Sequence, residues 1–247
     1  MGESRCGWGA RFGGAVAVVA AALALAAAGS GAPAGAASVL VYLSPAYSPA
    51  ERAADLISRM TLAEKATQLG TTNALAIPRL GVQEYAYWSE AQHGVNAFWG
   101  GDASNPTGVD MTVTATSFPT NFAASLAWDP ALIYRETSAI SDEARGFLDP
   151  SLFGKAQNDL GPDAGDYGSL FYFAPTVNID RDPRWGRVDE AFGEDPLLTG
   201  MLGAAWVEGF QGENRQGHML GRYLKAVATL KHYALNNTED NRTGISS

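Results

Sequence analysis

Cysteine is almost absent from this sequence. The one cysteine among 247 residues is Cys6, close to the N-terminus. A single thiol cannot form an internal disulfide, and Cys6 also lies in a segment that we expect to be removed. The rest of the chain therefore has no thiol nucleophile, and its hydrophobic core must hold it together.

Several signatures of cofactor and hydrolase chemistry are missing as well. The three histidines, His93, His218 and His232, do not have the spacing of metal ligands. There is no phosphate-binding glycine loop and no dinucleotide fingerprint. A Gly-x-Ser-x-Gly motif is also lacking, which argues against an esterase triad. We expect no metal and no cofactor.

Basic residues are scarce. The chain has 17 Lys and Arg against 26 Asp and Glu, a formal net charge of −9. Nucleic-acid phosphates require lysine and arginine, so this balance argues against a nucleic-acid partner. A neutral or cationic ligand fits the charge better.

The N-terminus has the pattern of a targeting segment. Arg5 and Arg11 precede an alanine-rich apolar run over residues 14–28, and small residues up to Ala36 fit a cleavage site. This predicts a secretory signal peptide over residues 1–36 and a secreted protein. The alternative is a membrane anchor, but the run is short, so we expect no stable membrane association after signal removal. Either interpretation implies export.

The remainder, residues 37–247, repeats the order strand, polar end, loop, helix. Strands are expected at 85–88, 171–179 and 226–233. Paired short helices are expected over 49–69, where Thr61 and Glu64 form a capping-box pattern. Further helices are expected within 122–147, with a new start at Asp129-Pro130, and over 196–210, ended by Gly212. With no hairpin signal between the strands, the order predicts an α/β fold with parallel strands.

Polar side chains follow each expected strand. Glu90 and His93 follow the first, a charged loop containing Arg187 follows the second, and Lys231, His232 and later Arg242 follow the third. A lysine inside an apolar run needs a partner or a ligand. Arginine beside Trp185 and several carboxylates also suits a sugar, because the guanidinium donates paired hydrogen bonds to neighbouring hydroxyls. The bland alternative is that the charges only hold a loop.

These motifs resemble a known family. The block NIDRDPRWGRVDEAFGEDP, followed by TLKHYALNNTEDNR, is similar to the N-terminal catalytic domain of glycoside hydrolase family 3. Upstream blocks agree in order: ERAADLISRMTLAEKATQL, IPRLGVQEYAYWSEAQHGV and TSFPTNFAASLAWDP. The resemblance covers about residues 43 to 247. The WSEAQHGV block is most similar to the β-xylosidase branch.

The resemblance implies a (β/α)8 TIM-type barrel, of which this chain would contain only the N-terminal part. It also implies a retaining exo-glycosidase that removes β-linked sugars from the non-reducing end through a covalent intermediate. Carried over by motif, the residues lining the first sugar subsite would be Glu90, Arg187, Lys231, His232 and Arg242. An oligosaccharide or glycoside would be the substrate, and no catalytic residue can be assigned in this chain.

The departures from the family pattern are specific. The family nucleophile is an aspartate in a Ser-Asp block on a later strand, and the acid/base follows it. Ser141-Asp142 lies inside a helical pattern and is not that block. We therefore expect an inactive fragment whose missing partner is the C-terminal part of the same polypeptide. A β-glucosidase, an α-L-arabinofuranosidase and a non-catalytic sugar-binding protein remain as alternatives.

Overall fold

The computed structural model describes residues 40–70, 73–87, 89–95, 115–146, 170–240 and 242–244. The chain divides into two compact units, Met1–Asp55 and Leu56–Ser247, with the boundary inside the first helix. The predicted signal peptide, Cys6, the predicted loop at 153–169 and nearly all of the loop at 99–117 lie outside the described residues. No described helix combines the length and the apolar character needed to cross a bilayer.

The first unit contains the short 3-10 helix η1 (Val41–Leu43) and the start of α1 (Pro49–Arg59). Ser48 and Glu51 form a capping box at the start of α1: Ser48 Oγ accepts from the Glu51 N–H at 3.3 Å, and Glu51 Oε2 accepts from the Ser48 N–H at 2.8 Å. The Asp55 carboxylate accepts from the backbone N–H of Tyr42 at 3.0 Å, and Arg52 Nε donates to the Tyr42 carbonyl at 2.9 Å. These contacts fix η1 against α1.

The second unit begins with the end of α1 and with α2 (Leu62–Thr67). The Thr61 hydroxyl accepts from the Glu64 N–H at 3.2 Å, and Glu64 Oε2 accepts from the Thr61 N–H at 2.8 Å. This reciprocal pair is the predicted capping box, so the expected break between two short helices is confirmed. Arg79 also forms an ion pair with Glu64, and this pair lowers the pKa of the Glu64 carboxyl to about 2.

The first described sheet contradicts the expectation of parallel strands. Strands β1 (Asn73–Ala74) and β2 (Tyr85–Ala86) pair antiparallel, with Asn73 opposite Ala86. The chain reverses through the 3-10 helix η2 (Pro78–Leu80), which ends at Gly81 in the left-handed region, φ 65°. The chain is reversed by this longer connection and not by a two-residue turn, so the sequence carries no short hairpin signal here.

The second sheet is parallel, as predicted. Strand β3 (Phe171–Tyr172) pairs with β4 (Val227–Ala228), with Phe171 opposite Val227. The two segments stay adjacent beyond the strands, because Thr176 forms a parallel bridge with Lys231. The expected strands at 171–179 and 226–233 are thus correct in place and direction but shorter as regular structure. The described strands form two two-stranded sheets, so this part of the chain contains no closed barrel.

Helices α3 (Asn121–Ser125), α4 (Pro130–Gly146) and α6 (Pro196–Gln211) confirm three of the predicted elements. A new helix does begin at Pro130. Asp195 caps α6, since its Oδ1 accepts from the Leu198 N–H at 2.6 Å. Gly212 ends α6 with φ 77°, a left-handed conformation that favours glycine.

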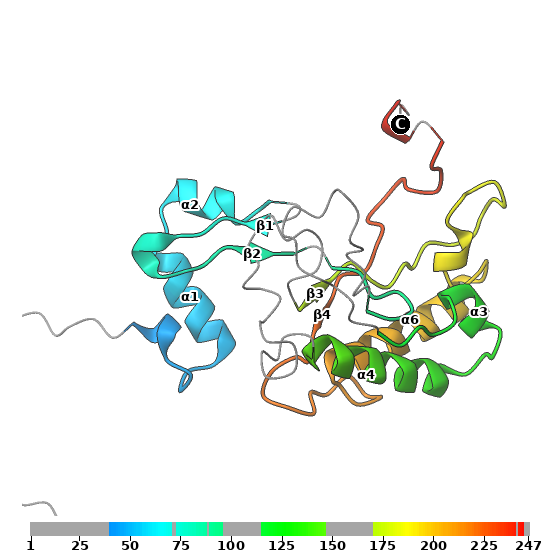
Figure 1. Cartoon of the computed structure of the whole chain (residues 1–247), viewed down its shortest axis with the longest axis horizontal. Helices are drawn as coiled ribbons and strands as arrows, with labels where there is room; N and C mark the ends of the chain where they lie inside the picture. Colours follow the sequence, from blue (N-terminus) through cyan, green and yellow to red (C-terminus); the bar gives the residue numbers. More distant parts are fainter. Residues whose placement is uncertain are drawn as a thin grey trace, which may run out of the picture. The chain divides into compact units, whose positions relative to one another are not determined.

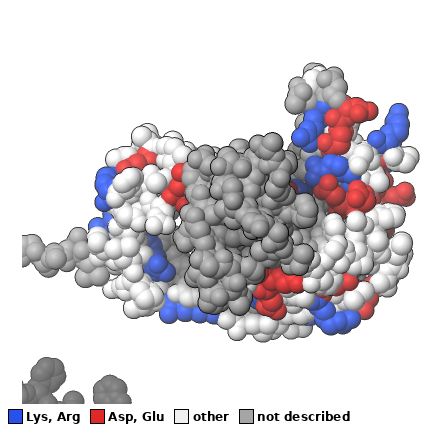
Figure 2. Space-filling view, viewed as in Figure 1, with Lys and Arg blue, Asp and Glu red and all other residues white. Residues whose placement is uncertain are grey.

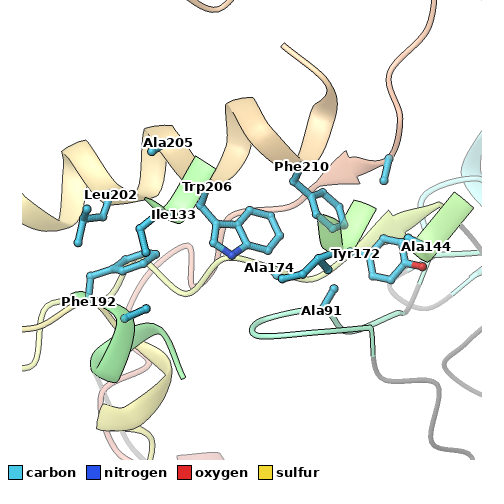
Figure 3. Packing of buried hydrophobic residues seen from close by; sticks show 13 residues of the cluster. Ala91, Ile133, Ala144, Tyr172, Ala174, Phe192, Leu202, Ala205, Trp206 and Phe210 are labelled. Carbon is cyan, nitrogen blue, oxygen red and sulfur yellow. The ribbon is translucent and has the colours of Figure 1, made fainter. Parts of the chain in front are cut away.

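The hydrophobic core lies between α4, α6 and β3. Figure 3 shows Trp206 and Phe210 projecting from α6 toward Tyr172 and Ala174. The rings of Trp206 and Phe210 stack at 4.5 Å, and Phe210 meets Tyr172 edge-on at 5.2 Å. Such aromatic pairs add to the free energy gained from burial alone.

Helices α4 and α6 lie side by side (Figure 1) and approach closely at one glycine. A Cβ built on Gly209 would collide with the Thr137 hydroxyl and with the Tyr134 carbonyl. The Ser138 hydroxyl donates to the Gly209 carbonyl at 3.4 Å across this contact. Only a residue without a side chain permits this separation of the helices.

The apolar residues of these helices differ in exposure. Leu197 is 72% exposed, Leu126 is 68% exposed and Met201 is 51% exposed. Ile133, Ile140 and Ala144 are buried. Apolar periodicity marks the width of a helical stripe but not which part of that stripe finds a neighbour.

Candidate active site

Lys231, which lies in an apolar run, forms an ion pair with Glu90. Its Nζ lies 3.1 Å from both carboxylate oxygens of Glu90. The lysine follows β4 and the glutamate follows β2, so residues far apart in the sequence meet at the ends of two strands. The Lys231 side chain is only 15% exposed. Breaking this ion pair would therefore cost more free energy of unfolding than breaking a pair on the surface.

Arg187 is held by a second glutamate. Its Nε and Nη2 donate to Glu190 Oε1 and Oε2, both at 2.6 Å. Arg187 precedes the 3-10 helix η5 (Val188–Glu190), where residues three apart lie on one face, so the pair forms within a single turn. Burial raises the pKa of the Glu190 carboxyl, but the hydrogen bonds from Arg187 and the charges of Arg187 and Lys231 bring it below its ordinary value.

A neutral hydrogen-bond network surrounds Glu190. Gln92 Nε2 donates to Glu190 Oε2 at 3.2 Å and also contacts the Thr176 hydroxyl. Gln92 Oε1 accepts from the Thr176 backbone N–H at 3.1 Å and from Asn121 Nδ2 at 3.0 Å. The indole N–H of Trp206 donates to the Gln92 carbonyl at 3.3 Å. The network therefore joins the core helix α6 to the strand ends.

His232 is neutral and has a defined tautomer. Asn178 Oδ1 accepts from the His232 backbone N–H at 3.0 Å and lies 2.9 Å from Nδ1, so Nδ1 carries the proton. Nε2 is then an acceptor, 3.2 Å from Arg187 Nη1. Burial lowers the pKa of His232 to about 4, with the charges of Arg187 and Lys231 acting in the same direction.

Arg242 joins the cluster through another acidic residue. Its Nη1 donates to Glu239 Oε2 at 2.8 Å, while Glu239 Oε1 accepts from the Trp185 indole N–H at 3.2 Å. Glu239 Oε1 also lies 3.8 Å from Arg187 Nη1. Arg242 is 55% exposed, so it lies at the rim of the cluster and reaches Arg187 only through Glu239.

Asp180 has a different environment within the same loop. It is 9% exposed, and neither carboxylate oxygen has a hydrogen-bond partner among the described residues. Burial raises the pKa of this carboxyl to about 6, and the negative charges of Glu194 and Asp189 add to the effect. Asp180 is thus a buried acid that no donor in the described part of the chain stabilises.

The structure brings together all five residues expected at the site: Glu90, Arg187, Lys231, His232 and Arg242. His93 is not part of the cluster, because its exposed ring lies 3.0 Å from the Phe118 carbonyl. Sequence reasoning did not single out Glu190, Gln92, Asn178 and Glu239. The nearest available signal was the position of Glu190 three residues after Arg187, which suits a pair on one helical turn.

Acidic and basic side chains intermix at this end of the second unit. Figure 2 shows them side by side at the upper right, where Figure 1 places the loop that leads into α6 and the C-terminal segment. Within the described residues, no group of three or more His, Cys, Asp or Glu side chains could hold a metal ion. The arrangement instead offers fixed N–H donors and carboxylate acceptors, the groups that recognise neighbouring hydroxyls.

The sequence of this chain is similar to those of known proteins. The family model for the glycosyl hydrolase family 3 N-terminal domain matches residues 79–245. A relative named "Probable beta-D-xylosidase 7" from Arabidopsis thaliana is 40% identical over 184 residues, 74% of this chain and 22% of the relative. A "Xylan 1,4-beta-xylosidase" from Xylanibacter ruminicola is 38% identical over 201 residues, 81% of this chain and 20% of the relative.

A solved structure is similar as well. The exo-β-xylosidase XlnD, determined in complex with a xylobiose aziridine probe, superposes with a TM-score of 0.61 at 30% identity. The superposition covers 82% of this chain and 23% of that one. This chain thus spans about a fifth of the length of the curated relatives it matches. With a family model that matches more than half of its residues, the chain belongs to glycosyl hydrolase family 3, through the N-terminal domain of that family.

Proposed function

We propose that the cluster around Lys231 is the first sugar subsite of a β-xylosidase-type glycosidase. The observation that carries the proposal is the meeting of Lys231 and Glu90 at 3.1 Å at the ends of two strands, with Arg187 brought to the same place by Glu190, which it shares with Lys231. Strand ends are where enzymes with parallel α/β sheets bind their substrates. The names of the relatives support β-linked xylose as the sugar.

The chemistry of the cluster suits a polyhydroxylated ring. Arg187 has five N–H groups, and three of them are directed at Glu190 and His232, so two remain for hydroxyl oxygens. Lys231 Nζ supplies further donors and the Glu90 carboxylate supplies acceptors. His232 Nε2 and Arg242 complete the proposed subsite. Several charged groups at fixed positions distinguish hydroxyl orientations better than one would.

We also propose that this chain binds the sugar without hydrolysing it. Retaining glycosidases need two carboxyl groups about 5 Å apart across the scissile bond. The resemblance places both in later sequence, and the one Ser-Asp pair of this chain is part of α4, where Ser141 is fully buried. Residues 37–247 would then be the N-terminal portion of a (β/α)8 barrel whose other strands come from the C-terminal part of the family's polypeptide. The N-terminal pattern adds export, with cleavage after residues 1–36.

Two assays on the purified chain test this proposal. Calorimetric titration with xylobiose should show saturable binding, with D-glucose binding more weakly, and the variant Lys231→Met should lose at least tenfold in affinity. An aryl β-xyloside should be hydrolysed no faster in the presence of the chain than in buffer alone. Saturable release of the aryl group would overturn the proposed inactivity, and absence of xylobiose binding would overturn the proposed subsite.

The export proposal has its own measurement. The protein should be expressed with its natural N-terminus in a secreting host, and the N-terminus of the product in the medium should be read by mass spectrometry. A start close to residue 37 is expected. A product that stays in the membrane fraction with residues 1–36 intact would favour the anchor instead.

A further inference from the structure

We propose that Glu190 is a positioning residue that orients Arg187 and Lys231 toward the sugar without contacting the sugar itself. This inference rests on the proposed sugar subsite. Glu190 is distinct from Glu90, which the family resemblance assigns to sugar hydroxyls. Both glutamates lie near Lys231, but their other contacts differ. These contacts assign the sugar to Glu90 and the positioning of Arg187 and Lys231 to Glu190.

The first argument is the geometry of the Arg187 pair. Two parallel hydrogen bonds of 2.6 Å fix both the plane and the direction of the guanidinium. With one edge of the fork turned to Glu190, the remaining N–H groups of Nη1 and Nη2 point away from it. A single hydrogen bond would leave the plane free to rotate, so the bidentate pair decides where the sugar donors are.

The second argument is charge. Lys231 Nζ lies 4.0 Å from Glu190 Oε2, on the same carboxylate that binds Arg187. One negative group therefore separates two partly buried cations that would otherwise repel each other. Without it, Arg187 and Lys231 would not share a small volume at the strand ends.

The third argument is that Glu190 has its own donors. Besides Arg187, the Thr176 hydroxyl and Gln92 Nε2 each donate to Oε2 at 3.2 Å. The Glu190 backbone carbonyl accepts from Asn121 Nδ2 at 2.9 Å. Two N–H groups of Arg187, the Thr176 hydroxyl and Gln92 Nε2 thus all donate to this carboxylate, three of them to Oε2. Most of its acceptor capacity is used within the protein, which assigns it to holding Arg187 and not to a sugar hydroxyl.

The test uses the whole chain and the isosteric variant Glu190→Gln. Glutamine keeps the shape but replaces one oxygen with an NH₂ group that cannot accept from Arg187, Thr176 or Gln92. The readout of orientation is the ¹⁵N–¹H signal of Arg187 Nε, assigned by its loss in Arg187→Lys. In the natural sequence this proton should exchange slowly at neutral pH. In Glu190→Gln its exchange should be at least tenfold faster, and the xylobiose dissociation constant should rise at least tenfold.

The matched control is Asp189→Asn, which removes the same charge at the neighbouring, exposed position. It should leave the Arg187 signal and the xylobiose affinity within twofold of their original values. Where Glu190→Gln does not fold, Thr176→Val removes one donor to Glu190 with little change of shape. That variant should accelerate Arg187 Nε exchange several-fold.

The outcomes separate this inference from the proposed function. An Arg187 signal that is unchanged in Glu190→Gln overturns the positioning role. So does a signal that is lost while the xylobiose affinity stays the same. If the natural chain binds no xylobiose, the proposed subsite is wrong, yet the loss of Arg187 protection in Glu190→Gln would still support its orientation by Glu190.

Discussion

Glu190 and Asp180 are carboxylates of one charged loop whose pKa values shift in opposite directions. Asp180 is buried and Glu190 is half-buried, and burial alone raises the pKa of each. Glu190 accepts from Arg187, Thr176 and Gln92, so its pKa falls below the ordinary value. Asp180 has no hydrogen-bond donor among the described residues, and acidic neighbours raise its pKa further. Burial thus sets the cost of each charge, and the donors within reach decide whether that cost is offset.

The largest effect on the free energy of unfolding should come from removing the cation that Glu90 and Glu190 share. Lys231→Met would leave Glu90 without its lysine and Glu190 with one cation fewer. Breaking a fully buried pair costs about 3–5 kcal/mol. Because Glu90 and Glu190 are partly exposed, we expect about 2–3 kcal/mol less free energy of unfolding, measured by urea denaturation at pH 7.

The matched control for this variant is Lys65→Met, on the exposed surface of α2. It should change the free energy of unfolding by about 0.5 kcal/mol or less. Equal losses in the two variants would mean that Lys231 is no better partnered than a surface lysine, and the contrast between the two carboxylates would lose its basis.

A smaller loss is expected when the neutral network is broken. Gln92→Leu removes the acceptor of the Thr176 backbone N–H and of Asn121, and it also removes a donor to Glu190. A buried group left without a partner costs about 1–3 kcal/mol, so we expect a loss near 2 kcal/mol. The exposed glutamine variant Gln83→Leu should have almost no effect in the same urea experiment.

Asp180→Asn should stabilise the protein, in contrast to both preceding variants. Since the folded pKa is raised from 3.8 to about 6, the group favours folding below pH 4, and that contribution is lost as the pH rises through 6. The asparagine variant should gain about 1 kcal/mol at pH 7.5, after allowance for solvent screening, and nothing at pH 4. A gain of the same size at both pH values would contradict the assignment to ionisation.

The smallest effect concerns His232. A folded pKa near 4 means that this histidine favours folding above pH 6.5 and loses that contribution as the pH falls through 4. Long-range ¹⁵N–¹H NMR should show an Nδ1-protonated, neutral ring from pH 8 to pH 5. Asn178→Ala should shift the ring toward a mixture of tautomers. A ring that titrates near 6.5 would place His232 in water instead of beside Arg187.

Local structure followed closely from the sequence. The Thr61–Glu64 capping box, the helix start at Pro130 and the helix end at Gly212 each depend on a few neighbouring residues. The parallel direction expected for the strand at 85–88 was wrong, and its partner β1 was not predicted, because strand partners are chosen by tertiary contacts that no short pattern encodes. For the same reason, Leu197 and Met201 could not be separated from the buried residues of α6.

The sequence predicted which residues would lie together in the cluster, but not the contacts that join them. Lys231 stood out because an apolar run does not tolerate an unpartnered cation, and the family motif identified the other predicted site residues. Glu190 stood among nine charged residues of one loop. Its role depends on Gln92, which is 98 residues away in the sequence, and on Thr176, which is 14 residues away, and the fold brings both to it.

The geometry of the charged cluster around Lys231 depends on Gly209, which lies in the contact between α4 and α6. A methyl group there would push α4 and α6 apart, because the Thr137 hydroxyl and the Tyr134 carbonyl occupy its place. Trp206 belongs to the same helix, and its indole N–H binds the Gln92 carbonyl on the other side of the core. Widening the interhelical gap would therefore act on the strand ends through the indole. An alanine at position 209 would thus disturb the proposed sugar subsite without altering any group that is proposed to touch a sugar.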